Sequence, residues 1–596
     1  MSSNYYEEKN MFSLFTLLER YRSYYSMFIY RLISILSKLI RIRTKYTRLE
    51  LIGLIIFISL LLNIFSLHYF FQCSSLTNHE KSLSFISKSK DLNNNPISTI
   101  ERSRKALEKL KILLNSVMSS NDQPWIWLPT SEYPSVPYQL TSLLNQHIPK
   151  PINNHTIVPQ SVKNEINRVC QRLNKANQVY GDIWCKLFTK SYADTLATTT
   201  TLLDDNTTYI ITGDIDLMWL RDSSAQVHQY MMSISNDKDI QRIIEGLIRR
   251  QTKFIYSNPY ASSFRLTLRP NPPSDDSLEP IHIQKGRNIH VAMHNYELDS
   301  LCYHLRLSYT WWKQTKRINP FNQQWLIAVN IIIQIMIIEQ HHSQISPYRY
   351  TELGNNHQGS PVAYTGMTWT GFRPSDDKTK FGYLIPSNMM ATVVLKQSAE
   401  MIKEIFPEQV LLLEQIKQLH VDILSGIHTY GVVKHDKYGQ IYAYETDGFS
   451  QTLLVDDANV PSLLSASYFG FKTPYDPQDQ LIISTRNFIL SKDNPLFYQG
   501  QYAYGIGSHH TEKKYVWPMS IIMEGLTNNS KENLDSVWKR LEISHTGTFS
   551  MHESFNVNNP KHFTRHWFAW VNSLFAELIL VHLDDLENWL KNRRSD

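Results

Sequence analysis

The sequence predicts a fold dominated by α-helices, in which paired helices form a toroid behind an N-terminal membrane-spanning helix. From about residue 123 onward, segments of helical periodicity alternate with loops rich in Gly, Pro, Asn and aromatic residues, and convincing strand patterns are few. Roughly a dozen such segments indicate paired helices whose loops gather at one end. No short internal repeat is visible, which argues against a regular solenoid.

Composition narrows the class of protein. The 596 residues can hold one large catalytic domain behind a tail. Tyr (33 residues) and Trp (13) are plentiful while only 19% of residues are charged, which suits binding of polar ligands by stacking and hydrogen bonding. The net charge of +6 is ordinary for this length, so composition gives no reason to expect nucleic acid as a partner.

The first element is a predicted membrane anchor. Residues 51–71, LIGLIIFISLLLNIFSLHYFF, carry no formal charge over roughly 20 positions, the length a helix needs to cross a bilayer. The run begins too far into the chain for a cleaved signal peptide, and a buried core helix is the competing interpretation. Nine Lys and Arg against four Glu in residues 1–50 predict a cytosolic tail and type II topology.

The next segment, 72–120, is rich in Ser, Asn and Lys and is predicted to be a lumenal stem, with a helical patch around 100–118. The catalytic domain is then expected at 121–596. Sequons at Asn154, Asn206 and Asn528 fit a lumenal side. These features predict a secretory-pathway membrane, in the Golgi. Cys170 and Cys185 either pair in an oxidising lumen or stay as two free thiols.

The helices of the domain are expected in the following order. The ranges with helical periodicity are 162–187, 224–256, 296–316, 323–341, 388–406, 409–430, 461–469, 477–490, 515–526, 531–546 and 566–592.

Two loops before these helices concentrate carboxylates, arginines and aromatics. One is GDIDLMWLRDSSAQVHQY at 213–230, where Trp219 stands among charged residues: Asp214, Asp216, Arg221 and Asp222. Helix capping by Asp-Ser-Ser explains one of these carboxylates but not the set. The other loop is 296–300, where the acids either bind ligand or only favour the positive end of a helix.

The loop TGMTWTGFRPSDD at 365–377 reads as a sugar site. Trp369 offers an apolar face, Arg373 can hold a hydroxyl or a carboxylate, and the glycines let a ligand approach the backbone. Asp376 and Asp377 are adjacent, and two neighbouring carboxylates rarely share one environment, so one of them suits a general acid. The competing interpretation is a simple turn.

Later loops add further candidates. Asp456, Asp457 and Asn459 precede an apolar helix, so both capping and sugar binding fit. His509 and His510 end a glycine-rich loop, but no accompanying ligand spacing supports a metal. Glu553, in MHESF at 551–555, lies between helices among His and aromatic residues, where a base that activates water could be displayed.

Read together, these motifs resemble glycoside hydrolase family 125, the exo-acting α-1,6-mannosidases, including membrane-anchored fungal members known as meiotically up-regulated proteins. The resemblance covers about 120–590 and rests on motifs in the family's order: GDIDLMWLRDSSAQ, TGMTWTGFRPSDD, YLIPSN, DDANVPSLLS, GIGSHH and MHESF. It implies an (α/α)6 toroid, an inverting mechanism without metal or other cofactor, and a glycan substrate that ends in α-mannose.

The resemblance also implies residue roles. The acid falls in the Asp376–Asp377 pair, with Asp376 preferred, and the base is Glu553. An inverting pair stands about 6.5 to 9.5 Å apart so that water fits between base and sugar. The residues assigned to substrate binding are Asp214, Asp216, Trp219, Arg221, Asp222, Trp369, Arg373, Asp456, Asp457, His509, His510 and Arg565.

Three alternatives stay open at this level. A different inverting toroid hydrolase, such as a glucosidase, would differ in the aryl α-glycoside that it cleaves. A glycan-binding protein that retained the pocket without activity is the second, and a calcium-dependent mannosidase, sensitive to chelators, is the third.

Overall fold

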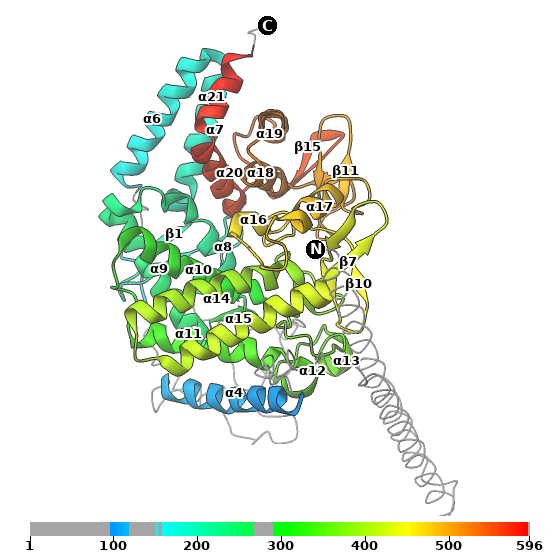
Figure 1. Cartoon of the computed structure of the whole chain (residues 1–596). Helices are drawn as coiled ribbons and strands as arrows, with labels where there is room; N and C mark the ends of the chain where they lie inside the picture. Colours follow the sequence, from blue (N-terminus) through cyan, green and yellow to red (C-terminus); the bar gives the residue numbers. More distant parts are fainter. Residues whose placement is uncertain (1–95, 118–148, 153–157, 267–289, 594–596) are drawn as a thin grey trace, which may run out of the picture. The chain divides into compact units, whose positions relative to one another are not determined.

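The structure is a computed structural model that describes residues 96–117, 149–152, 158–266 and 290–593 (Figure 1). Residues from Thr99 to the C terminus form one compact unit. The predicted cytosolic tail at 1–50 and membrane helix at 51–71 lie outside the described residues and stay predictions. Within the described ranges, no helix is both long and apolar enough to cross a bilayer.

Twelve of the described helices alternate along the chain between an outer and an inner position. The outer helices are α7 (Gln178–Asp194), α9 (Lys238–Ser257), α11 (Gln323–Glu339), α15 (Val410–Gly431), α17 (Gln480–Ile489) and α19 (Lys531–Ser544). The inner helices are α8 (Leu220–Ala225), α10 (Leu298–Thr315), α14 (Ile385–Ile405), α16 (Ala466–Phe469), α18 (Pro518–Thr527) and α20 (Ala569–Val581). Each inner helix packs against the next, and α20 packs against α8. The inner ring therefore closes, and the predicted helical toroid is confirmed for these helices.

Local sequence sets where helices begin. Asp237 accepts hydrogen bonds from the amides of Asp239 and Ile240 and so caps α9, while Pro518 occupies the first turn of α18, where no amide donor is needed. The predicted helix at 162–187 is in fact two, α6 (Gln160–Ala176) and α7, because Asn177 leaves the helical conformation and caps α7 with its side chain. Similarly, 566–592 divides at His582 into α20 and α21 (Leu583–Lys591).

Helix α4 (Pro96–Val117) lies in the range predicted to be a stem, yet from Thr99 it belongs to the compact unit. It packs on α11 and α15: Arg102 donates to Asp422 at 2.6 Å, and the buried Ser103 hydroxyl donates to the carbonyl of Ile337 at 2.7 Å. This contact explains α11, an outer helix that is apolar on every side, because its outward face is covered by α4.

The strands are short and antiparallel, and three sheets bring distant loops together. In the sheet β10-β9-β6, Leu384 of β6 (Tyr383–Leu384) pairs with Glu445 of β9 (Glu445–Thr446). In the sheet β13-β14-β15, Val516 of β13 (Tyr515–Val516) pairs with Phe555 of β14 (Ser554–Asn556). The third sheet joins β3 (Met218–Trp219), β4 (Ser263–Phe264) and β5 (Val291–Met293).

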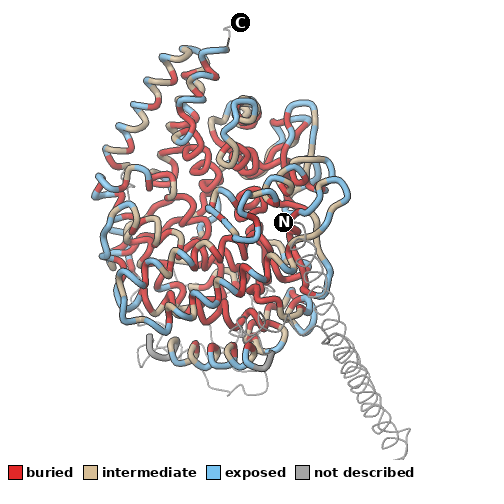
Figure 2. Tube along the Cα trace, in the orientation of Figure 1, coloured by how far each residue is buried: buried red, intermediate tan, exposed pale blue. Residues whose placement is uncertain are grey.

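The remaining strands form hairpins or complete these sheets. They are β1 (Thr200–Leu202) with β2 (Thr208–Ile210), β7 (Val432–His435) with β8 (Gly439–Tyr442), β11 (Phe497–Gln499) with β12 (Tyr504–Ile506), and the edge strands β10 (Thr452–Leu453) and β15 (Asn559–Thr564). Short helices α12 (His342–Ile345) and α13 (Gly354–His357) lie between α11 and α14. Buried residues follow the inner helices, and exposed ones follow the outer surface (Figure 2).

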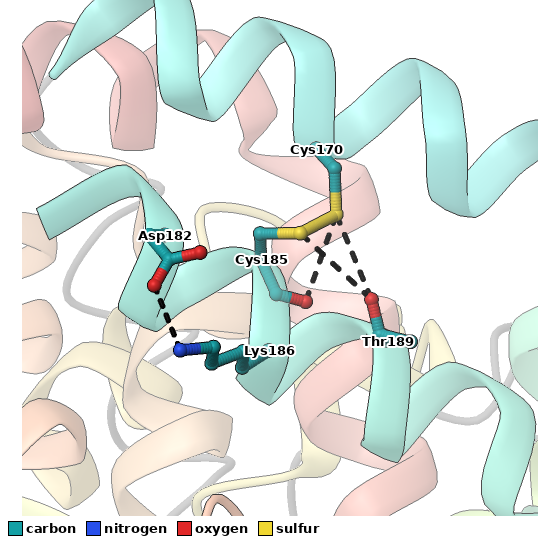
Figure 3. The surroundings of a disulfide bond; sticks show 5 residues. All are labelled: Cys170, Asp182, Cys185, Lys186 and Thr189. Carbon is teal, nitrogen blue, oxygen red and sulfur yellow. Dashed lines mark hydrogen bonds and ion pairs between the residues drawn. A yellow bond between two sulfur atoms is a disulfide. The ribbon is translucent and has the colours of Figure 1, made fainter. Parts of the chain in front are cut away.

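A disulfide joins α6 to α7. Cys170 and Cys185 are bonded, which decides between the two alternatives that the sequence left open (Figure 3). The hydroxyl of Thr189 lies 3.6 Å from the sulfur of Cys170, and Asp182 and Lys186 form an ion pair on the same helix. Among the described cysteines, Cys302 is free and buried.

Candidate active site

The candidate residues come from segments that precede the inner helices. Arg221 and Asp222 lie in the first turn of α8, and Glu297 occupies the N-cap position of α10 without a side-chain cap hydrogen bond. Because outer and inner helices alternate, the inner helices run in one direction and their N-terminal ends share one end of the toroid. Side chains that are far apart in sequence therefore meet there.

Arg221 is the centre of a buried carboxylate cluster. Its Nη1 pairs with Glu297 and lies 3.3 Å from Asp299 Oδ2, while its Nη2 lies 3.3 Å from Asp376 Oδ1. Its Nε lies 3.4 Å from Asp222 Oδ2. Burial opposes the positive charge, but the carboxylates outweigh it and raise the pKa of Arg221. One guanidinium thus faces four acidic side chains.

These acids do not all hold a negative charge equally well. Burial raises the pKa of Asp222 to about 6 and that of Asp299 to about 6, against the opposing attraction of Arg221. Burial raises the pKa of Glu297 further, with help from Asp376 and Asp299. The cluster therefore retains protons at a pH where exposed carboxylates are ionised.

The loop at 365–377 is both a turn and part of the site. The carbonyl of Asp377 accepts from the amide of Arg373 at 2.8 Å, and the amide of Asp376 donates to the carbonyl of Arg373 at 3.0 Å. Asp376 has a φ of +67°, a conformation that is uncommon outside glycine and is found at active sites. The turn directs Asp376, 29% exposed, toward Arg221.

Asp377 faces a different neighbour. Its Oδ1 lies 3.5 Å from His510 Nδ1, and its Oδ2 accepts from the Ser375 hydroxyl at 3.1 Å. Burial opposes the charge of Asp377, but His510, Ser375 and Arg373 outweigh it and lower the pKa of Asp377. The same contact raises the pKa of His510 to about 9, with smaller contributions from Glu553 and Asp376. The two adjacent carboxylates therefore have different partners.

Glu553 enters from the opposite side of the ring. Its side chain is 9% exposed, and its Oε1 lies 3.6 Å from Arg565 Nη1. Arg565 is fixed by Asp214, whose carboxylate accepts from Nε at 2.9 and 3.2 Å. His552 stacks on Phe563 and hydrogen-bonds the carbonyl of Arg565, so the residue before Glu553 is also fixed. Burial lowers the pKa of His552 to about 4, which keeps the ring neutral.

Arg373 binds Glu445, a carboxylate in the stretch 444–449 to which the sequence analysis gave no role. Its Nε donates to Glu445 Oε1 at 2.6 Å, and the other oxygen of Glu445 accepts from the amides of Lys380 and Phe381. Nη1 of Arg373 lies 3.4 Å from His509 Nδ1. Arg373 therefore links the loop at 365–377 to β9 through Nε, and its Nη1 lies next to His509.

Trp369 corrects the sequence interpretation. It was expected to form an apolar wall for sugar, but it is 1% exposed and stacks on His342 with ring centroids 3.5 Å apart. The glycines serve this packing, because a Cβ on Gly382 would lie 2.4 Å from the Trp369 ring and one on Gly371 2.9 Å from it. Trp369 therefore supports the loop through buried packing contacts.

Three more expectations change. Asp456 is fully buried and accepts from the amides of Leu463 and Leu464 in the turn before α16, so its carboxylate is held by backbone and is not free for sugar. Asp457, also buried, accepts from the amide of Asn459 and the hydroxyl of Ser508, which fixes the loop that carries the histidines. Asp216 is exposed and belongs neither to the cluster around Arg221 nor to the acids that contact Arg565.

Trp219 is buried in β3, where its register partner is Ser263. No described protein group accepts a hydrogen bond from its indole nitrogen. The sequence left two roles open for Glu297 and Asp299, ligand binding or a favourable helix start. The structure places both side chains against Arg221. Two acids two positions apart at a helix N terminus were the available signal for this pair; for Glu445 the signal was its place in the polar stretch 444–449.

Comparisons with known proteins identify the family. The family model described as metal-independent α-mannosidase, glycoside hydrolase family 125, matches residues 182–580. The chain belongs to glycoside hydrolase family 125. It is 35% identical over 409 residues to the meiotically up-regulated gene 157 protein of Schizosaccharomyces pombe, a match that covers 65% of this chain and 79% of the relative.

A solved member of family 125 is also similar. It is a metal-independent α-mannosidase from Streptococcus pneumoniae in a non-productive complex with α-1,6-mannobiose, 37% identical, with a TM-score of 0.65. The match covers 72% of this chain and 99% of that chain. Family 125 membership makes this protein a glycoside hydrolase of the α-mannosidase class. Within the described part of the chain, no group of three or more His, Cys, Asp or Glu is arranged to hold a metal ion.

Proposed function

We propose that this protein is an exo-acting α-mannosidase that hydrolyses terminal α-1,6-linked mannose from glycans with inversion of the anomeric carbon. The observation that carries the proposal is the contrast between two carboxyl groups. Asp376 shares the single guanidinium of Arg221 with Glu297, Asp299 and Asp222, while Glu553 lies 3.6 Å from Arg565, which Asp214 holds in place. An acid in a cluster where carboxyl groups outnumber the cation suits a proton donor, and a carboxylate outside that cluster suits a base.

The assignment of the acid follows from its neighbours. Asp377 has a lowered pKa and pairs with His510, so it is ionised in the range where a general acid must be protonated. We therefore assign the acid to Asp376, which donates a proton to the glycosidic oxygen. Glu553 takes a proton from water, and the oxygen of that water bonds to the anomeric carbon from the opposite face. We assign Arg565, Asp214, Asp222 and His510 to binding of the terminal sugar.

The linkage rests on the relative whose structure contains α-1,6-mannobiose. The decisive experiment incubates the protein with α-1,6- and α-1,3-linked mannobiose and follows the anomeric proton by NMR. We expect β-mannose as the first product, from the 1,6-linked disaccharide. Release of α-mannose first would contradict inversion, and release of glucose from aryl α-glucosides without cleavage of mannosides would favour the glucosidase alternative.

Two further measurements separate the remaining alternatives. A calcium-dependent mannosidase would lose activity in chelator, whereas we expect an unchanged rate. A glycan-binding protein without activity would bind mannose but release none from either disaccharide. Neither measurement depends on the anomeric configuration of the mannose that is released.

We also propose that the enzyme is a type II protein of the secretory-pathway membrane, in the Golgi, anchored by residues 51–71. The charge excess in residues 1–50, the sequons and the Cys170–Cys185 disulfide support a lumenal domain. Protease treatment of sealed microsomes tests it: the domain should be protected until detergent is added. Digestion without detergent would contradict the topology.

A further inference from the structure

Glu297 is a buried acid with one oxygen fully engaged and the other without a partner. Its Oε2 pairs with Nη1 of Arg221 and accepts from the hydroxyl of Ser300 at 2.8 Å. Its Oε1 is buried, and no described group donates a hydrogen bond to it. An ionised carboxylate with a bare buried oxygen is costly, whereas a protonated oxygen can act as a donor.

A partner for that proton is at hand. Asp376 contacts the same guanidinium as Glu297 and helps to raise the pKa of Glu297, and two carboxyl groups can share a hydrogen bond only when one of them carries a proton. Arg221 holds both, through Nη1 and Nη2 respectively, so their relative position is fixed by one planar group.

We propose that Glu297 is a neutral carboxylic acid that donates a hydrogen bond from Oε1 to Asp376 and so positions the acid for proton transfer. This inference rests on the proposed function. When Asp376 passes its proton to the glycosidic oxygen, a negative charge appears on Asp376, and the Glu297 hydroxyl stabilises it. Glu297 keeps its own proton throughout; the bond from the anomeric carbon to the leaving oxygen breaks, water adds, and Glu553 takes the proton of that water. A donor fixed before charge develops lowers the barrier without reorganisation.

The charged surroundings favour this protonation state. Elements packed around Glu297 and Asp376 contribute Arg221 and Asp222 from α8, Asp299 from α10, His510 from the loop before β13, and Tyr348 and Tyr350 from the loop before α13. Acids outnumber Arg221 in the buried part of this set, so they are not all ionised together. Burial raises the pKa of Glu297 in the same direction.

Two substitutions separate a neutral donor from an ionised carboxylate. In Glu297→Gln the amide oxygen can accept from Arg221 and Ser300 while the amide nitrogen donates to Asp376, so we expect kcat on α-1,6-mannobiose within about 10-fold of the wild type. In Glu297→Ala the donor is lost and kcat falls by about 100-fold or more. An activated aryl α-mannoside needs little protonation of its leaving group, so Glu297→Ala should lose much less there.

The pH profile adds a readout that a purely structural role would not move. Loss of the Glu297 proton in the wild type contributes to the fall of kcat at alkaline pH. Because an amide does not titrate, kcat of Glu297→Gln should fall at a pH about one unit higher than kcat of the wild type. Asp299→Asn is the matched comparison, because Asp299 also contacts Arg221. The factor by which this variant lowers kcat should be the same for both substrates. Thermal unfolding checks that each variant folds.

A spectroscopic measurement tests the proton without turnover. The infrared difference between wild type and Glu297→Gln at neutral pH should contain the C=O band of a protonated carboxylic acid. Absence of that band overturns the inference, as does a Glu297→Gln variant as inactive as Glu297→Ala or one with an unchanged alkaline limb. Failure of the wild type on every α-mannoside would refute the proposed function, and the infrared band would still decide the inference.

Discussion

Arg221 Nη2 lies 3.3 Å from Asp376 Oδ1 although 155 residues separate them in the chain. The contact joins the first inner helix to the loop before the third, and it gives Asp376 surroundings that differ from those of Asp377. Neither residue alone predicts the other, because the contact exists only once the inner ring has formed. The chemistry of the site can therefore be tested residue by residue.

Glu553→Gln should abolish turnover while leaving mannoside binding nearly intact, because the amide keeps the shape and loses the basicity. We expect kcat to fall by about 1,000-fold or more. Steady-state kinetics and calorimetric titration with the mannoside measure the two effects separately. Glu532→Gln on the exposed face of α19 is the control and should change neither. A Glu553→Gln variant with the wild-type rate would remove Glu553 from the role of base.

Asp376→Asn and Asp377→Asn should behave differently although the two positions are adjacent. Asp376→Asn removes the proton donor, so kcat should fall by about 100-fold or more on mannobiose and far less on an activated aryl α-mannoside. Asp377→Asn removes a partner of His510, so its loss should not depend on the leaving group. Comparison of the two substrates for each variant measures this. The reverse pattern would move the acid to Asp377.

The His510–Asp377 pair should stabilise the fold over a defined pH window. The pKa of His510 is raised to about 9 from 6.5, so its contribution is complete below pH 6.5 and is lost as pH rises through about 9. The lowered pKa of Asp377 means that the contribution is also lost in acid. Urea unfolding of wild type and His510→Gln should differ most below pH 6.5 and converge above pH 9. A constant difference across that range would contradict the pairing.

Helix α4 should be required for full stability. Arg102→Ala leaves the buried Asp422 without its cationic partner, although Gln418 still donates to it, and this costs about 1–3 kcal/mol. A chain that begins at residue 121 uncovers the apolar face of α11 and should unfold at a lower temperature than one that begins at residue 96. Lys111→Ala is the control, because its partner Glu108 lies on the same helix and such pairs contribute less than about 1 kcal/mol. Equal melting temperatures for the two chains would show that α4 is dispensable.

Loss of the Cys170–Cys185 bond should destabilise the protein by about 3 kcal/mol, because the bond closes a short loop and restricts the unfolded chain. Unfolding of the variant with Ser at both positions measures this. Reductant should lower the melting temperature of the wild type and leave that variant unchanged. Proteolysis without reduction should also release the two cysteines in one linked peptide.

Sequence reasoning recovered most of the helices, because apolar periodicity and loop composition are local signals, although the single helix predicted at 224–256 is divided between the end of α8 and α9. It failed where contacts between distant parts of the chain decide the role of a residue. Trp369 looked like a sugar platform because a stacking partner such as His342 cannot be seen in sequence. For Asp456 the sequence left backbone capping and sugar binding both open, because the amides that decide between them lie further along the chain. The apolar α11 gave a clear signal of burial, but its cover, α4, comes from a range of ordinary stem composition.

Closure of the inner ring has a consequence for how the chain matures. The first inner helix meets the last one, and Arg172 on α6 pairs with Glu587 on α21 at 2.6 Å, so both ends of the ring lie together. During synthesis the early helices must wait for nearly the whole chain before the ring can close, and a truncated product would leave apolar helix faces without a neighbour. For the same reason, a circularly permuted chain that links these ends and opens at an exposed loop should still complete the ring.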